Sequence, residues 1–168
     1  MHRLELALAD RRIILEILDT AGIEEFPVMK RIAIAHGDAF LILYAVNDAR
    51  SFDIARQMRQ LVLEIKGDSP ATLPIVIVGN KSDVDASARA ISRTDAETIV
   101  RDQWKTALVE TTCHERESVL DAFRLLLRMA NIDASFSPDV PRRSSDPSLT
   151  GDKAQRTTTP KRQSCAQQ

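Results

Sequence analysis

Cysteine, glycine and long apolar runs are all scarce in this chain of 168 residues. Its two cysteines, Cys113 and Cys165, lie too far apart for a disulfide framework or a zinc pair, so we expect a reducing compartment. None of the five glycines precedes a lysine, which excludes a phosphate-binding loop ending in Gly-Lys-Ser/Thr. No apolar run has the length of a membrane-spanning helix. The net charge of −1 gives no reason to expect a nucleic-acid partner.

The composition otherwise suits a soluble globular domain, with 43% hydrophobic and 28% charged residues. The character of the chain changes near residue 133, where Pro, Ser, Thr, Asp and Arg begin to dominate. We therefore expect one domain over residues 1–132 and a disordered tail over residues 133–168.

Hydrophobic periodicity predicts an α/β fold. Alternating patterns indicate a hairpin of strands at residues 3–8 and 13–18, and continuous apolar runs indicate buried strands at 39–46, 75–78 and 108–111. Helices are expected from Pro27 to near Gly37, from a Ser51 cap to Gly67, from a Ser92–Asp95 capping box to about residue 103, and over 119–130. This order predicts a mostly parallel sheet with one antiparallel edge strand.

The first candidate site lies where the second hairpin strand ends, at Asp19-Thr20-Ala21-Gly22. Open α/β sheets bring ligand-binding residues to the carboxyl ends of their strands. The Asp19 carboxylate can hold a metal-bound water, and the Gly22 amide can approach a phosphate because glycine has no Cβ. An ordinary strand-to-turn junction would have the same pattern.

The second candidate site, Asn80-Lys81-Ser82-Asp83, follows a buried strand. A carboxylate here can accept two hydrogen bonds from a ring with adjacent N–H and NH₂ donors, as guanine has and adenine lacks. The alternative is a polar turn with a solvated Lys–Asp pair. A third segment, Glu110-Thr111-Thr112-Cys113, ends the last strand; Thr111 or Thr112 can brace a loop whose N–H groups face a carbonyl oxygen.

These three segments, in this order, resemble the Ras superfamily of small GTPases over about residues 3–132. Residues 26–29, 37–40 and 135–139 are most similar to the Dexras/Rhes and neighbouring Ras-like branches. The resemblance implies a P-loop NTPase fold, GTP or GDP with Mg²⁺ as ligands, GTP hydrolysis and a role as a signalling switch. It assigns nucleotide-binding roles to Asp19, Gly22, Asn80, Lys81, Asp83, Thr112, Cys113 and His114, with Asp19 facing the metal through water.

The resemblance also implies that this sequence lacks the family's first strand, phosphate loop, first helix and switch threonine. The absent strand would lie between the hairpin and the strand at 39–46, so its loss would open the middle of the sheet. We therefore expect an N-terminally incomplete product that folds poorly alone and binds the triphosphate weakly. Ile23 replaces the glutamine that usually orients the attacking water, so hydrolysis should be slow. His114 stands where the family usually has lysine.

Two other interpretations stay open. A non-enzymatic pseudo-GTPase would bind effectors and regulators through Ile23–His36 and the last predicted helix. A flavodoxin-like domain with another ligand would make the three motifs coincidental. The tail ends in Cys165-Ala166-Gln167-Gln168, which has the form of a prenylation box except for the polar Gln167. We expect a cytoplasmic protein, attached reversibly to the inner face of the plasma membrane if Cys165 carries a lipid.

Overall fold

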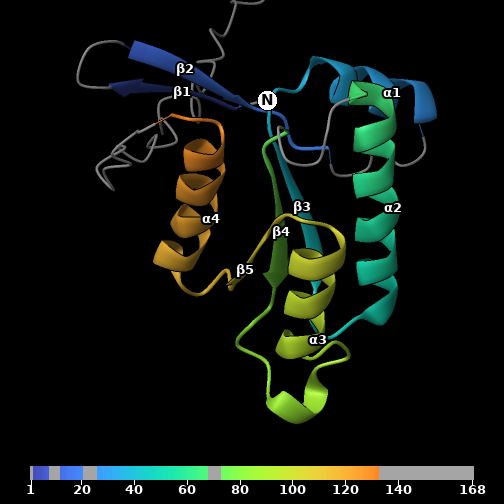
Figure 1. Cartoon of the computed structure of the whole chain (residues 1–168). Coiled ribbons are helices and arrows are strands. Elements are labelled where there is room, and N and C mark those ends of the chain that lie inside the picture. The colour runs from blue at the N-terminus through green and yellow to red at the C-terminus, as the bar shows by residue number, and fades with distance from the viewer. Residues whose placement is uncertain (1, 8–11, 21–25, 68–72, 133–168) are drawn as a thin grey trace, which may run out of the picture. The chain divides into compact units, whose positions relative to one another are not determined.

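The computed structural model describes residues 2–7, 12–20, 26–67 and 73–132 (Figure 1). The strands are β1 (His2–Ala7), β2 (Arg12–Ile17), β3 (Phe40–Ala45), β4 (Ile75–Asn80) and β5 (Ala107–Thr111). The helices are α1 (Pro27–His36), α2 (Ala49–Lys66), α3 (Arg93–Thr98) and α4 (Arg116–Met129), with a 3₁₀ turn η2 (Ala86–Ala88) and a π-helical turn η3 (Ile99–Gln103). The element order predicted from periodicity is confirmed, and the expected tail lies outside the described residues.

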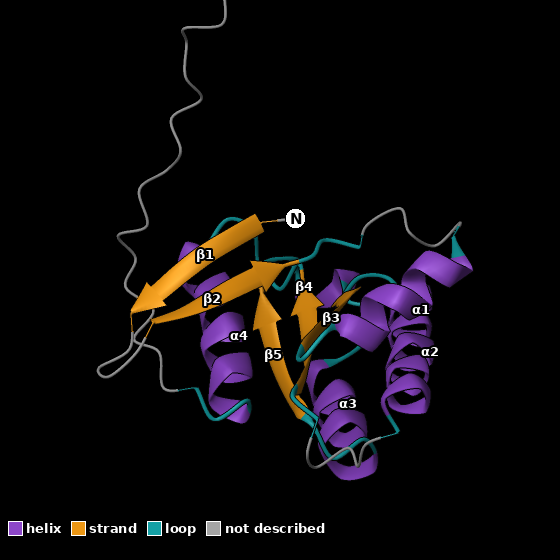
Figure 2. Cartoon of the chain, turned by 90° about the horizontal axis from the view of Figure 1, so that it is seen from above, coloured by secondary structure: helices purple, strands orange, loops and turns teal. Residues whose placement is uncertain are grey.

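A parallel sheet with the order β3-β4-β5 carries most of the core. Along β4, Ile75 and Ile77 join the core under α2 and α3, whereas Val76 and Val78 join the core under α4. Figure 2 shows α4 on one side of these strands and α2 and α3 on the other. Because helices cover both faces, β4 is apolar at consecutive positions rather than at alternate ones.

The hairpin of β1 and β2 is antiparallel, with Leu4 opposite Leu15, as the alternation predicted. It forms a two-stranded sheet of its own, because no ladder joins β2 to β3 among the described residues. The predicted antiparallel strands are therefore present, but in the described part of the chain they form no strand pairing with the parallel sheet. The turn at residues 8–11 lies outside the described residues.

The predicted cap of α2 was wrong by three residues. The helix begins at Ala49, and the Asp48 carboxylate accepts a hydrogen bond from the Arg50 N–H at 2.9 Å. The Ser51 hydroxyl instead accepts from the Ala45 N–H at 2.9 Å and donates to the Asp48 carbonyl at 2.6 Å. Ser51 thus fastens the first turn of α2 to the end of β3, while Asp48 supplies the cap.

The predicted Ser92 cap of α3 is confirmed, since its hydroxyl accepts from the Asp95 N–H at 3.1 Å. The α-helix ends at Thr98, however, and the chain continues to residue 103 as the π-helical turn η3. This wider turn precedes Trp104, which is buried and stacks on Phe52 with ring centroids 5.4 Å apart. The aromatic contact joins α2 to the end of η3.

Several large apolar side chains remain exposed. Leu43 on β3 is 56% exposed, and α1 presents Val28, Met29 and Ile32 to solvent. Within the described part of the chain, no helix is long and apolar enough to cross a membrane.

Candidate functional site

The carboxyl ends of β4 and β5 bring two of the three predicted segments together. Asn80, the last residue of β4, pairs in register with Thr111, the last residue of β5. Beyond the strands, the Ser82 N–H donates to the Thr111 carbonyl at 3.0 Å. Asn80–Asp83 and Thr111–His114 therefore lie at one edge of the parallel sheet, where open α/β sheets bind ligands.

The chain turns sharply as β4 ends. Lys81 has φ +64°, in the left-handed region that non-glycine residues seldom adopt. The Asn80 side-chain oxygen accepts the Lys81 N–H at 2.8 Å, and the Asn80 carbonyl accepts the Val46 N–H at 3.0 Å. Asn80 thus stabilises an uncommon backbone conformation at the candidate site.

The carboxylate of Asp83 is oriented by Thr112. The Asp83 carboxylate accepts a hydrogen bond from the Thr112 hydroxyl and a second one from the backbone N–H of Asp83. These two bonds hold the pKa of Asp83 below its usual value, and nearby His114 lowers that pKa further. The His114 Nε2 lies 3.9 Å from the Asp83 Oδ2. With its side chain 44% exposed, Asp83 offers an ionised, oriented acceptor to a ligand.

The loop after β5 is held to the start of α4. The Thr112 N–H donates to the Ser118 hydroxyl at 3.1 Å, and the Glu115 N–H donates to the Thr112 carbonyl at 3.3 Å. Thr112 is buried, whereas Cys113 and His114 are exposed. Thr112 therefore ties this loop to Ser118 and Glu115, and Cys113 follows it on the surface.

A largely buried ion pair lies beside these segments and was not predicted from the sequence. Arg89, in the loop after η2, pairs with Glu110 of β5, and their side chains are only 14% and 11% exposed. Glu110 begins one of the predicted segments, but a single arginine in a loop has no periodicity that would reveal its partner. Only the folded positions of the loop and the strand bring the two charges together.

Comparison with known proteins shows to which family this chain belongs. The Ras family model matches residues 1–132. The chain belongs to the Ras family. It is 33% identical over 135 residues to the human GTP-binding protein Rhes, covering 77% of this chain and 51% of that protein.

Other relatives agree with this assignment. The GTP-binding protein Di-Ras2 of Macaca fascicularis is 35% identical over 115 residues, covering 68% of this chain and 56% of that protein. The GTP-binding protein Rheb homolog 1 of Caenorhabditis elegans is 33% identical over 138 residues, covering 82% of this chain and 65% of that protein. The Ras-family chain described here thus spans roughly half to two thirds of the length of these relatives.

The first predicted segment of this Ras-family chain is only partly described. Asp19 lies two residues beyond the end of β2 and is exposed, whereas Gly22 and Ile23 lie outside the described residues. The described residues include no group of three or more His, Cys, Asp or Glu side chains that could hold a metal. Because Mg²⁺ demands near-octahedral oxygen coordination, the Asp19 carboxylate alone does not make a magnesium site, and we assign no reaction step to the metal.

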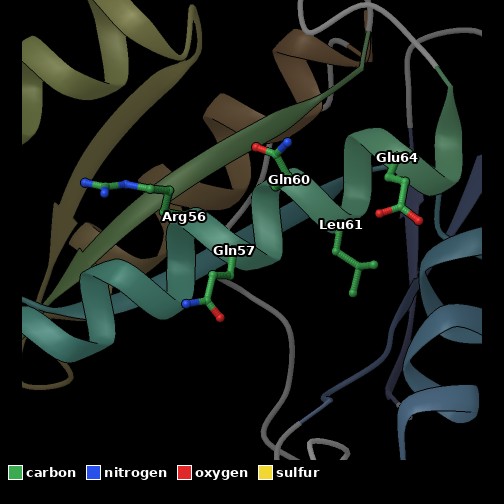
Figure 3. A pocket seen from close by; sticks show the side chains of 5 residues that line it. All are labelled: Arg56, Gln57, Gln60, Leu61 and Glu64. Atoms are coloured by element: carbon green, nitrogen blue, oxygen red, sulfur yellow. The ribbon is translucent and has the colours of Figure 1, made fainter.

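An open groove of about 410 Å³ runs along α2 and is separate from these segments. Its lining side chains all come from α2, as Figure 3 shows: Arg56, Gln57, Gln60, Leu61 and Glu64. Glu64 also pairs with Arg31 of α1 at 3.1 Å. None of the predicted nucleotide-binding residues lines this groove.

Proposed function

We propose that this Ras-family chain binds guanine nucleotides through the segments that end β4 and β5. The observation that carries the proposal is the Asp83 carboxylate, which Thr112 orients and which stays ionised at neutral pH. Guanine has an N–H and an adjacent NH₂ that can both donate to such a carboxylate. Adenine lacks this pair of donors, and a desolvated carboxylate without partners costs about 1–3 kcal/mol or more.

The neighbouring residues would complete the base site. We assign the Asn80 side chain, the Lys81 aliphatic stem and the backbone N–H of Cys113 to contacts with the ring and its carbonyl oxygen. His114 lies against Asp83 and would border the same ring. These roles follow the family resemblance, and the arrangement of Asn80, Asp83 and Thr112 at one sheet edge supports them.

The triphosphate would be held far less well than the base. The sequence has no Gly-Lys pair and therefore no loop of the kind that surrounds phosphates with backbone N–H groups. Asp19 and Gly22 remain the candidates for the water-mediated Mg²⁺ contact and the γ-phosphate contact. We propose that this chain binds GTP only slightly more tightly than guanosine. We also propose that Ile23, in place of the usual glutamine, makes GTP hydrolysis slow.

A second candidate function is a non-enzymatic interaction through Ile23–His36. The observation that favours it is the exposed apolar set Val28, Met29 and Ile32 on α1, since exposed apolar patches often mark protein contacts. In this reading the chain binds effectors or regulators of the Ras family without turning over GTP. Lipidation of Cys165, a residue outside the described ones, would add reversible membrane attachment.

Titration of the 168-residue chain with guanosine, adenosine and Mg²⁺·GTP, followed by NMR, tests the primary proposal. We expect saturable shifts at Asn80–Asp83 and Thr112–His114 with guanosine, weaker binding of adenosine by at least about tenfold, and little gain with GTP. Asp83→Asn should abolish the preference for guanosine over adenosine. The matched control Asp85→Asn, on the same exposed loop, should keep that preference. Equal affinity for guanosine and adenosine would refute guanine binding by this site.

A further inference from the structure

The Arg89–Glu110 ion pair has an unusual setting for two charged side chains. Both are nearly buried, and the pair joins the loop after η2 to the strand β5. Buried ion pairs contribute little net stability, because removing both charges from water costs about as much as their attraction returns. A pair in this position is better suited to fixing the geometry of the segments that it joins.

Tyr44, Gly79 and Glu110 form a row across the parallel sheet, because Gly79 is in register with both of the others. A Cβ on Gly79 would lie 2.9 Å from the Tyr44 hydroxyl oxygen. Glycine at position 79 therefore leaves the space that the Tyr44 side chain occupies against β4. The Tyr44 hydroxyl is buried and has no hydrogen-bond partner among the described residues. Burial and then the charge of Glu110 raise the pKa of Tyr44 to about 12. The surroundings of Glu110 are thus poorly solvated, and Arg89 is its neutralising partner.

The segment between Asn80 and Ile91 is held at both ends. At its start, the Ser82 N–H donates to the Thr111 carbonyl. At its end, the N–H groups of Ala90 and Ile91 both donate to the Val46 carbonyl, at 2.9 and 3.1 Å. Asp83 lies between these attachments, and Arg89 ties the later part of the segment to the strand that leads into Thr112.

We propose that Arg89 and Glu110 are a positioning pair for guanine recognition, which holds the Asn80–Asp83 turn in place against the Thr111–His114 loop. The proposal rests on the proposed function, since it concerns how the same base site is held. Neither side chain needs to touch the base. Their loss would let Asp83 and Thr112 move relative to each other while the packed sheet stays folded.

The test replaces the pair with apolar side chains of similar length, Arg89→Met together with Glu110→Leu, in the full 168-residue chain. Guanosine and inosine are the probes, because inosine lacks the 2-amino group that Asp83 would bind. The matched control is Arg31→Met with Glu64→Leu, an exposed ion pair that also joins two elements. Urea unfolding of each variant separates a loss of folding from a loss of positioning.

We expect the apolar pair to unfold at the same or a higher urea concentration, to bind guanosine at least tenfold more weakly and to lose the preference over inosine. Hydrogen exchange at the Ser82 and Thr112 amides should rise at least tenfold, with exchange in α4 unchanged. The control variant should match the unmodified chain in every measurement. If the apolar pair does not fold, Glu110→Gln, which keeps shape and an acceptor oxygen, is expected to change the same readouts in the same direction by about threefold.

Unchanged exchange at Ser82 and Thr112 would overturn the positioning role whatever the nucleosides do. Unchanged guanosine affinity and preference would overturn it as well. Failure of the unmodified chain to prefer guanosine over adenosine would refute the proposed function instead. In that case hydrogen exchange at the Ser82 and Thr112 amides still tests whether the Arg89–Glu110 pair holds the two segments together.

Discussion

Gly79 and Tyr44 are in close contact across β3 and β4. A methyl group on Gly79 would lie 2.9 Å from the Tyr44 hydroxyl oxygen and 3.2 Å from a methyl carbon of Val46. Gly79→Ala should therefore lower the free energy of unfolding by about 1–3 kcal/mol, the usual cost of overpacking a core. Urea denaturation measures this. Part of the loss should be recovered in the Tyr44→Phe background, and an unaltered midpoint for Gly79→Ala would contradict the close approach.

The buried hydroxyl of Tyr44 makes stability depend on alkaline pH. Burial raises its pKa to about 12 in the folded chain, above the ordinary tyrosine value of about 10, so the folded state favours the protonated form. The corresponding stability is present below the unfolded pKa and is lost as pH rises through the folded one, amounting to about 2–3 kcal/mol.

Removing that hydroxyl tests the same contact. Tyr44→Phe should be neutral or stabilising near neutral pH, because the hydroxyl is buried without a partner among the described residues. Above about pH 10 the variant should retain the stability that the unmodified chain loses. Urea midpoints of both proteins across this pH range, corrected for their shared titration of lysines, provide the measurement. Parallel pH profiles would show that Tyr44 does not titrate as stated.

The start of α2 depends on a single cap. Asp48→Ala removes the acceptor of the Arg50 N–H and should cost about 1 kcal/mol of unfolding free energy. Asp53→Ala is the matched control on the same helix, since its carboxylate is exposed and lies 3.6 Å from Arg56. That control should change stability by less than about 0.5 kcal/mol. Thermal unfolding followed by circular dichroism compares the two, and equal losses would argue against a capping role for Asp48.

At the scale of elements, periodicity predicted every described α-helix and strand, but neither the 3₁₀ turn η2 nor how each element begins or ends. Ser51 and Asp48 are both good capping residues, and only the backbone conformation decides between them. The helix expected to reach residue 103 changes to a π-helical turn after Thr98, where Trp104 enters the core. The local sequence pattern does not reveal this change.

The candidate site was predictable where it depends on strand order. Parallel strands end at one edge of a sheet, so the segments that follow β4 and β5 lie close together, and the Thr112 hydroxyl bonds to the Asp83 carboxylate. The Arg89–Glu110 pair was not predictable, because it depends on the path of a loop. The contributions of Gly22 and Ile23 stay predictions, since both lie outside the described residues.

For the whole molecule, the parallel sheet ends in an apolar strand. Among the described strands, β3 pairs only with β4, and Leu43 on it is 56% exposed. Exposed apolar edge strands favour association between chains. We expect the chain to self-associate through this edge, and Leu43→Lys to reduce this association without loss of folding.

Sedimentation velocity across a concentration series measures the effect of Leu43→Lys. The control is Ile54→Lys, which removes a similarly exposed apolar side chain from α2 rather than from a strand. Self-association that persists in Leu43→Lys but disappears in Ile54→Lys would assign the contact to α2 instead of β3.

The stacking of Trp104 on Phe52 gives this chain a built-in optical probe. Trp104 is the only tryptophan, and the Arg59 guanidinium lies 5.6 Å from its ring centroid. The tryptophan emission spectrum therefore reports on a single site, the contact between α2 and the end of η3. Opening of that junction would shift the emission to longer wavelength, so local loosening can be followed there without attaching a dye.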